Sequence, residues 1–196
     1  MSRRRPILRS LVVLGLVAAC VATGTFAAFS ARTTSANNAL AAGTVTLADN
    51  DAGAAVLALP AAAPGQSSTG CIAVTYGGSL DAGVRLYAAL SGSLAPHLTL
   101  TVTRGTQAAP AFSSCTGFTA DATNYLGLGP GVLYSGALSA FPTTYAAGIV
   151  DPLPGSPETW TPGESHIYRF VVTLANTNAA QGLTQTADFT WEARNL

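Results

Sequence analysis

Polar and apolar residues alternate along most of the chain after residue 43, with the period of two that is typical of half-buried β-strands. Over residues 98–103, three apolar side chains alternate with three threonines. Residues 84–90 and 187–193 show the same alternation, and residues 43–48 are a shorter example. This parity assigns nine side chains to the apolar faces: Val84, Leu86, Ala88, Leu90, Leu98, Leu100, Val102, Phe189 and Trp191. The pattern predicts an all-β domain whose strands each pack one face on a core.

Two stretches about a hundred residues apart follow one pattern. PGQSSTGCIAVTY begins at Pro64 and PGESHIYRFVVTL begins at Pro162, with Pro, Gly, Ser, Val and Thr at matching offsets. Pro-Gly is typical of a tight turn, and a strand pattern follows in both copies. Because the flanking sequence does not repeat, we interpret the pair as two strands that are entered through the same kind of turn, in equivalent places of a two-sheet β-sandwich.

The stretch from Cys115 to Asp151 departs from the strand rhythm. It contains LGLGPG at 126–131, and Pro142 fits the first turn of a short helix. We therefore expect an irregular excursion with a short helical segment around 136–148. The side chains expected to dock it on the sandwich are Leu133, Tyr134, Leu138, Phe141 and Tyr145.

The N-terminus has the pattern of an export signal. A basic stretch precedes the apolar run from Leu11 to Ala22, and small residues follow. We expect residues 1–27 to be a signal peptide cut between Ala27 and Ala28, with an uncleaved membrane anchor or lipidation at Cys20 as alternatives. Residues 28–42 then form an N-terminal arm that is flexible or adds as a strand to another sheet, and residues 43–196 form one sandwich domain.

Charge excludes one class of partner. Charged residues make up 9% of the chain, against about 25% in ordinary soluble domains. Five arginines and nine acidic residues remain after residue 27, so the exported chain would carry a net charge of −4. No basic stripe is present, and we expect no nucleic-acid partner.

The cysteines agree with export. Cys71 and Cys115 remain as a pair once the signal has been removed. In an oxidising compartment such a pair is expected to form a disulfide. The alternative, a metal site, lacks a CxxC motif and has only two histidines to draw on.

Candidate chemistry is sparse. His97 and His166 are both expected near the surface, and a metal role for Glu164 with His166 is a minor alternative because the HExxH spacing is absent. The chain has no GxSxG motif, and its Gly-rich LGLGPG stretch lacks the lysine of a phosphate-binding loop. Asp49-Asn50-Asp51 fits an Asx turn, with a partial calcium site as the alternative. We predict no catalytic residue, no metal site and no cofactor.

The junction TFAAFSARTTSANNALAAGTVTL resembles that of the TasA/camelysin family, whose exported members are processed by a SipW-like signal peptidase. The matching positions are Ala27, Ala28-Phe29, the polar run 30–38, Leu40, and Gly43-Thr44 before the strand pattern at 45–47. The Pro-Gly turns at 64–65 and 162–163, with the Val-Thr strands that follow, are also similar to the family.

The resemblance implies a jelly-roll sandwich that is secreted to the cell surface or extracellular matrix. In the family, fibres of a biofilm matrix form when the N-terminal segment inserts as a strand into the next subunit. Here that assembly arm would carry Phe29 and Leu40, and the partners would be the signal peptidase, further copies of the chain and other matrix components. The chain departs from the fibre formers because it has no lysine and has a cysteine pair, so it resembles a distinct actinobacterial-type branch.

Two functions of other classes remain as alternatives. One is a monomeric secreted module that binds a carbohydrate or surface polymer through Tyr76, Tyr87, Tyr125 and Trp160. The other is the extracellular metalloprotease activity ascribed to camelysin-type relatives, for which the chain carries no metal-binding motif. The leading prediction is a secreted structural protein that is not an enzyme.

Overall fold

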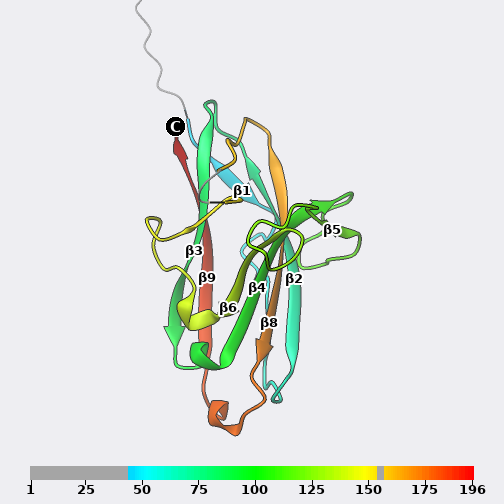
Figure 1. The fold of residues 1–196 in the computed structure, drawn as a ribbon, viewed down its shortest axis with the longest axis vertical. Helices are drawn as coiled ribbons and strands as arrows, with labels where there is room; N and C mark the ends of the chain where they lie inside the picture. The colour runs from blue at the N-terminus through cyan, green and yellow to red at the C-terminus, as the bar shows by residue number, and fades with distance from the viewer. Residues whose placement is uncertain (1–43, 154–156) are drawn as a thin grey trace, which may run out of the picture. The chain divides into compact units, whose positions relative to one another are not determined.

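The computed structural model describes residues 44–153 and 157–196, which form two antiparallel sheets with almost no helix (Figure 1). The larger sheet has the order β1-β2-β8-β4-β5, with β6 also paired to β4, and the smaller has the order β7-β3-β9. The strand bounds are β1 Leu47–Asp49, β2 Ser67–Tyr76, β3 Ala82–Gly92, β4 Leu98–Gln107, β5 Phe118–Ala120, β6 Val132–Ala137, β7 Ile149–Val150, β8 Ser165–Leu174 and β9 Gln185–Asn195. Three 3-10 turns are η1 Ala95–His97, η2 Leu138–Ala140 and η3 Asn178–Ala180. The predicted β-sandwich is confirmed at this level.

The core lies between the two sheets, as the alternation predicts. Leu98, Leu100 and Val102 of β4 are buried, whereas Thr99 between them is exposed. Phe170 of β8 contacts both Phe189 and Trp191 of β9, with ring centroids 4.6 and 5.9 Å apart. Aromatic side chains of both sheets therefore interlock at the centre of the core.

The two echoed stretches are neighbours in one sheet. β2 and β8 pair antiparallel, with Cys71 opposite Arg169 at the middle of the register. The Gly65 N–H donates to the Leu174 carbonyl at 3.0 Å, and the Gly163 N–H donates to the Tyr76 carbonyl at 2.8 Å. The turn before β2 is thus bonded to the last residue of β8, and the turn before β8 is bonded to the last residue of β2. Both glycines have positive φ, 79° and 87°, which a residue with a β carbon rarely adopts.

The short helical segment expected around 136–148 is present only as the 3-10 turn η2, and the helix expected to begin at Pro142 does not form. Residues up to Ala137 belong to β6, and only the 3-10 turn η2 follows before Phe141, which is extended. The Pro142 carbonyl accepts the N–H of Ala88 in β3 at 2.9 Å, so it is not available for a helical hydrogen bond. Docking of this segment is as expected, because Leu133, Leu138 and Phe141 are all buried.

The first strand also differs from expectation. β1 begins at Leu47 rather than near residue 43, although the carbonyls of Thr44 and Thr46 still accept hydrogen bonds from Ser79 and Gly77. The signal segment 1–27 with Cys20, the cut between Ala27 and Ala28, and the arm residues Phe29 and Leu40 all lie outside the described residues. No helix among the residues that are described is long and apolar enough to cross a membrane.

A disulfide joins Cys71 of β2 to Cys115 in the excursion, with their Cα atoms 5.2 Å apart. Next to it, Cys71 and Ser113 exchange two backbone hydrogen bonds, the Ser113 N–H bond being 2.9 Å long. The disulfide therefore fixes the start of the excursion to the edge of the larger sheet.

Replacing both Cys71 and Cys115 by Ser should lower the free energy of unfolding by roughly 4 kcal/mol, the loop-entropy value for a cross-link that spans 44 residues. Denaturant unfolding of the oxidised protein and of the double variant measures the difference. If the two curves coincide, the disulfide does not constrain the unfolded chain.

Candidate functional site

The outer edge of β9 has no strand paired to it among the described residues, although β1 lies close to it near Phe189 and Trp191. In the smaller sheet β9 pairs only with β3, and Ala88 of β3 lies opposite Phe189. The Ala88 N–H bonds to Pro142 on the far side, so the backbone groups of Phe189 point away from β3. Because this orientation alternates along the strand, the backbone groups of Ala187, Trp191 and Ala193 also point away from β3. No other described residue forms a backbone hydrogen bond with these four residues on that edge.

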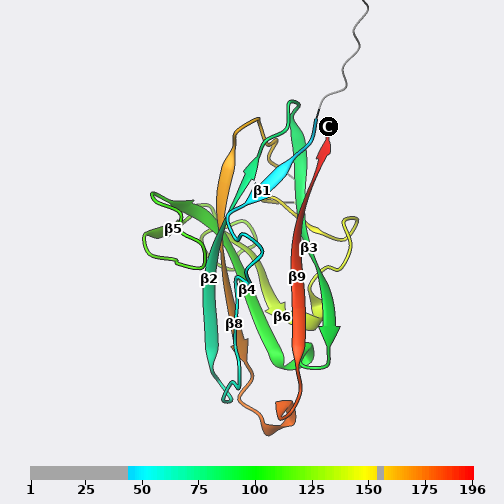
Figure 2. The same ribbon diagram turned by 180° about the vertical axis from the view of Figure 1, so that it is seen from behind.

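A groove with a volume of about 1210 Å³ runs beside this edge, and its lining is apolar on the walls and polar at its margins, where Asp49, Asp51 and Asp188 lie. Phe189 and Trp191 of β9 form one wall, and Ile72 of β2 and Val172 and Leu174 of β8 form the opposite wall. The Trp191 Nε1 atom is buried and has no acceptor among the described residues. Figure 2 shows the two strands β2 and β9 that border this side of the sandwich. The groove and the open strand together form a place where an extended segment could add to the sheet.

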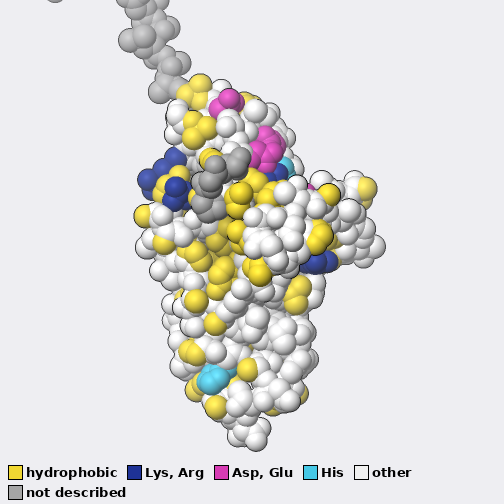
Figure 3. Space-filling model, viewed as in Figure 1, with side chains coloured by type: hydrophobic (Ala, Val, Ile, Leu, Met, Phe, Trp, Pro, Cys, Tyr) yellow, Lys and Arg dark blue, Asp and Glu magenta, His cyan; other side chains and the backbone are white. Residues whose placement is uncertain are grey.

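A buried charge network lies at the other side of the core, centred on Arg104 of β4. The arginine is 4% exposed, and its Nη1 atom lies 3.3 Å from Oδ1 of Asp151, which is 3% exposed. The same guanidinium is paired with Glu158, and its Nε atom lies 3.4 Å from Asp121 Oδ2. Figure 3 shows acidic side chains in the upper part of one face, with a histidine and basic side chains beside them.

Asp151 acts only as an acceptor in this network. Its Oδ2 atom accepts the Trp160 Nε1–H at 3.0 Å and the Tyr168 hydroxyl at 2.9 Å. Burial raises the pKa of the Asp151 carboxyl, and the charge of Arg104 opposes this rise. Burial alone would lower the pKa of Arg104, but Asp151 and Glu158 outweigh it and raise the pKa, so the guanidinium stays charged. The site holds an ion pair in a nearly dry environment.

The network joins the two sheets. Arg104 and Tyr168 belong to the larger sheet, whereas Asp151 is bonded through its backbone N–H to Val84 of β3. Trp160 and Ala82 of β3 exchange backbone hydrogen bonds of 2.9 and 3.1 Å. The segment that carries Asp151 and Glu158 is therefore attached to the smaller sheet, while their cation comes from the larger one.

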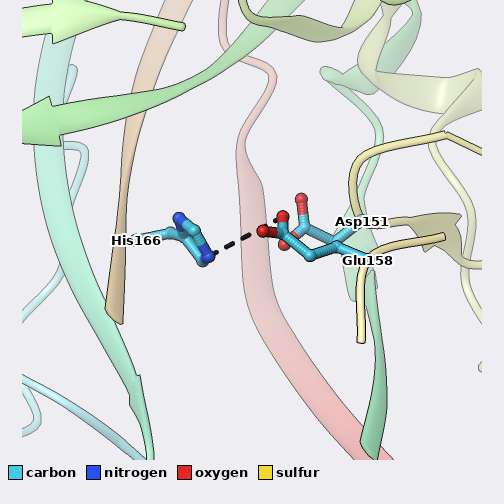
Figure 4. Close-up of side chains that lie close together, drawn as sticks. All are labelled: Asp151, Glu158 and His166. Carbon is cyan, nitrogen blue, oxygen red and sulfur yellow. Dashed lines mark ion pairs between the residues drawn. The ribbon is translucent and has the colours of Figure 1, made fainter. Parts of the chain in front are cut away.

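Asp151, Glu158 and His166 are the described residues whose arrangement best suits a metal ion, because their ligand atoms lie within 4.8 Å of one another (Figure 4). Arg104 already contacts all three, with its Nη2 atom donating to His166 Nδ1 at 3.0 Å. A divalent cation here would meet the charge of the guanidinium at close range. The network also lies apart from the groove, none of whose lining residues belong to it. This geometry favours a structural ion-pair network.

His166 donates from Nε2 to Glu164 Oε1 at 2.8 Å, so the two residues that the sequence paired do meet. Burial would raise the pKa of Glu164, but hydrogen bonds from the Thr161 N–H and from His166 outweigh it and lower the pKa. His166 is partly buried, as expected for a strand start, and His97 is half-buried in η1.

The Asp49-Asn50-Asp51 stretch forms turns. Asp49 Oδ1 accepts the Asp51 N–H at 3.3 Å, and Asp51 Oδ1 accepts the Gly53 N–H at 2.6 Å. Asn50 Oδ1 accepts the N–H of Ala73 in β2 at 2.9 Å. These oxygens serve the backbone, which agrees with the Asx-turn interpretation.

The four aromatic residues proposed as ligand contacts do not gather at a surface. They are candidates on the condition that they are exposed, and Tyr76 and Trp160, both 0% exposed, do not meet it. Both sit on the core side because their strand and bridge positions direct them inward. Tyr87 and Tyr125 are partly buried, and their hydroxyls donate to Glu192 and Asp121.

Sequence reasoning did not single out Arg104 or Asp151. A signal for Arg104 was present, because it follows Leu98, Leu100 and Val102 in the same parity. His166 likewise shares the parity of Tyr168, Phe170 and Val172. A charged or titratable residue on the core face of a strand indicates a buried partner. Nothing in the local pattern identifies Asp151 as that partner.

Comparison with known proteins adds no relative: no protein-family model matches the chain, and no curated protein matches it.

Replacing Arg104 by Met should lower the free energy of unfolding by about 3 kcal/mol, because Asp151 is left buried without its cation. Adding Asp151→Asn should recover part of the loss. Denaturant unfolding measures both variants, with Arg194→Met at an exposed pair as the matched control. A loss no larger for Arg104→Met than for this control would contradict the buried ion pair.

Tyr125 should titrate unusually late, since burial and its hydrogen bond to Asp121 raise the pKa of its phenol to about 12. Between the unfolded pKa of about 10 and this value, the folded protein holds one more proton, so stability falls as pH rises through this window. Ultraviolet titration of the protein, compared with Tyr125→Phe, isolates the transition. A difference spectrum that appears near pH 10 would disprove the shift.

Proposed function

We propose that the protein is a secreted structural protein of the cell surface or extracellular matrix, which assembles by adding the segment 28–42 of one copy to the sandwich of the next. The observation that supports it most is the open edge of β9 beside the groove. An 11-residue edge strand with free backbone groups favours pairing with another extended segment.

The occupant follows from the chain itself. Residues 28–42 carry one charge, Arg32, and precede a sandwich that forms one compact unit from Ala42 onward. Such a segment can pair with β9 through its backbone and place Phe29 and Leu40 against the groove. Insertion into a neighbour does not close on itself, so repeated insertion gives a filament.

Secretion is part of the proposal. The signal pattern at 1–27 and the disulfide between Cys71 and Cys115 support an oxidising compartment. We take the sandwich to be of the jelly-roll type and the chain to be a distant member of the TasA/camelysin family, on the junction motif described above. The signal peptidase is then its partner during export.

A monomeric binding module is the second candidate, and the groove would be its ligand site. The open edge of β9 favours the structural function, since a small ligand would leave its backbone groups unpaired. A metalloprotease is less well supported, because Arg104 contacts each member of the Asp151, Glu158 and His166 cluster.

Protein that begins at Ala28 should form elongated assemblies as its concentration rises, whereas protein that begins at Gly43 should stay monomeric. Light scattering and electron microscopy of both forms measure this, and thermal unfolding shows whether the shorter form keeps its fold. If both folded forms remain monomeric across the concentration range, the structural function is wrong and the binding module is favoured.

A further inference from the structure

One segment of the chain forms a further wall of the groove. Residues 53–62, here called the strap, run between β2 and β9 (Figure 2). Val56, Leu57 and Leu59 of the strap pack against the core, and the strap carries no charged residue. The strap therefore supplies apolar side chains at the place where an added strand would put its own.

The strap is held by side chains and not by sheet pairing. Residues 55–62 form no backbone hydrogen bond with the rest of the described chain, although the open edge of β9 borders the same groove. A segment that lacks backbone bonds and has few buried side chains opens at low cost relative to the core. An incoming strand could bond to β9, as the strap does not.

The strap also lies close against β2 at one point. A β carbon at Gly70 would overlap the carbonyl oxygen of Val56, so only glycine allows this approach. Gly70 is buried within β2 on the same face as Ile72, which lines the groove, although Gly70 itself does not line it. The contact with Val56 therefore fixes the strap at the margin of the groove.

We propose that the strap is a displaceable cover: it forms one wall of the groove in the free protein and moves away when the segment 28–42 of a second copy adds to β9. This inference rests on the proposed function and adds its regulation. Competition for the groove sets a threshold, because the incoming segment must replace the apolar contacts of Val56, Leu57 and Leu59 before its backbone bonds to β9 stabilise it.

A thiol on the strap reports its displacement. The full chain with Cys20→Ser and Leu57→Cys has its only free thiol at position 57, since Cys71 and Cys115 are joined. Adding a synthetic peptide of residues 28–42 to the dilute monomer should raise the rate of maleimide labelling by about tenfold, a shift of about 1.4 kcal/mol in the strap equilibrium. Ala58→Cys, at an exposed position of the same strap, should label equally fast with and without peptide.

Two outcomes distinguish a failure of the displaceable cover from a failure of the proposed strand addition. Fluorescence anisotropy of a labelled peptide measures binding independently. If the peptide binds while labelling of Leu57→Cys stays unchanged, the cover is disproved and strand addition stands. If no peptide binds at saturating concentration, strand addition fails and the cover fails with it.

Gly70→Ala provides a second test, and it replaces none of the residues that line the groove. Because the added methyl group pushes on Val56, the strap should loosen and the peptide should bind several-fold more tightly. Weaker binding by folded Gly70→Ala protein would show that the strap forms part of the binding site and would overturn the proposal. Should this variant not fold, the labelling experiment still decides.

Discussion

The ion pair between Arg104 and Asp151 is the interaction on which the relation of the two sheets depends. Its members are almost fully buried and come from different sheets, so the sheets cannot separate at that end without exposing or stranding a charge. Such a pair adds little net stability over apolar residues of the same volume, yet breaking it is costly. Its structural role is therefore to make one arrangement of the sheets much better than its alternatives.

The opposite side of the sandwich has no comparable ion pair among the described residues. There the sheets are separated by a groove, the outer edge of β9 has no paired strand among the described residues, and the strap relies on a few aliphatic contacts. Local stability in a protein follows the density of buried contacts and backbone bonds. The molecule thus combines a rigidly specified side with one that can exchange partners, which is the division that an assembling subunit requires.

Alternation along the chain was sufficient to predict the long strands and the core faces that they share, but not β5, β6 and β7, which lie in the excursion. The faces of β3, β4 and β9 follow parity because each strand covers a shared core on one side. It did not predict that the echoed stretches pair with each other, since strand order depends on contacts between residues about a hundred positions apart. The pattern also did not predict that Pro142 lies outside a helix, because its carbonyl accepts a hydrogen bond from Ala88, which is distant in sequence. Asp151 could not be identified, because its role arises only when β7 meets β4 and β8 in space.

The reciprocal arrangement of the Pro-Gly turns has a consequence for folding fidelity. β2 and β8 are rich in small and β-branched residues, a composition that tolerates several alignments of neighbouring strands. Because the turn before each strand bonds to the last residue of the other, sliding in either direction would detach one turn and drive the other into its neighbour. The two turns therefore limit the register at both ends of the strand pair, so the correct register is selected by strand length as well as by side-chain packing.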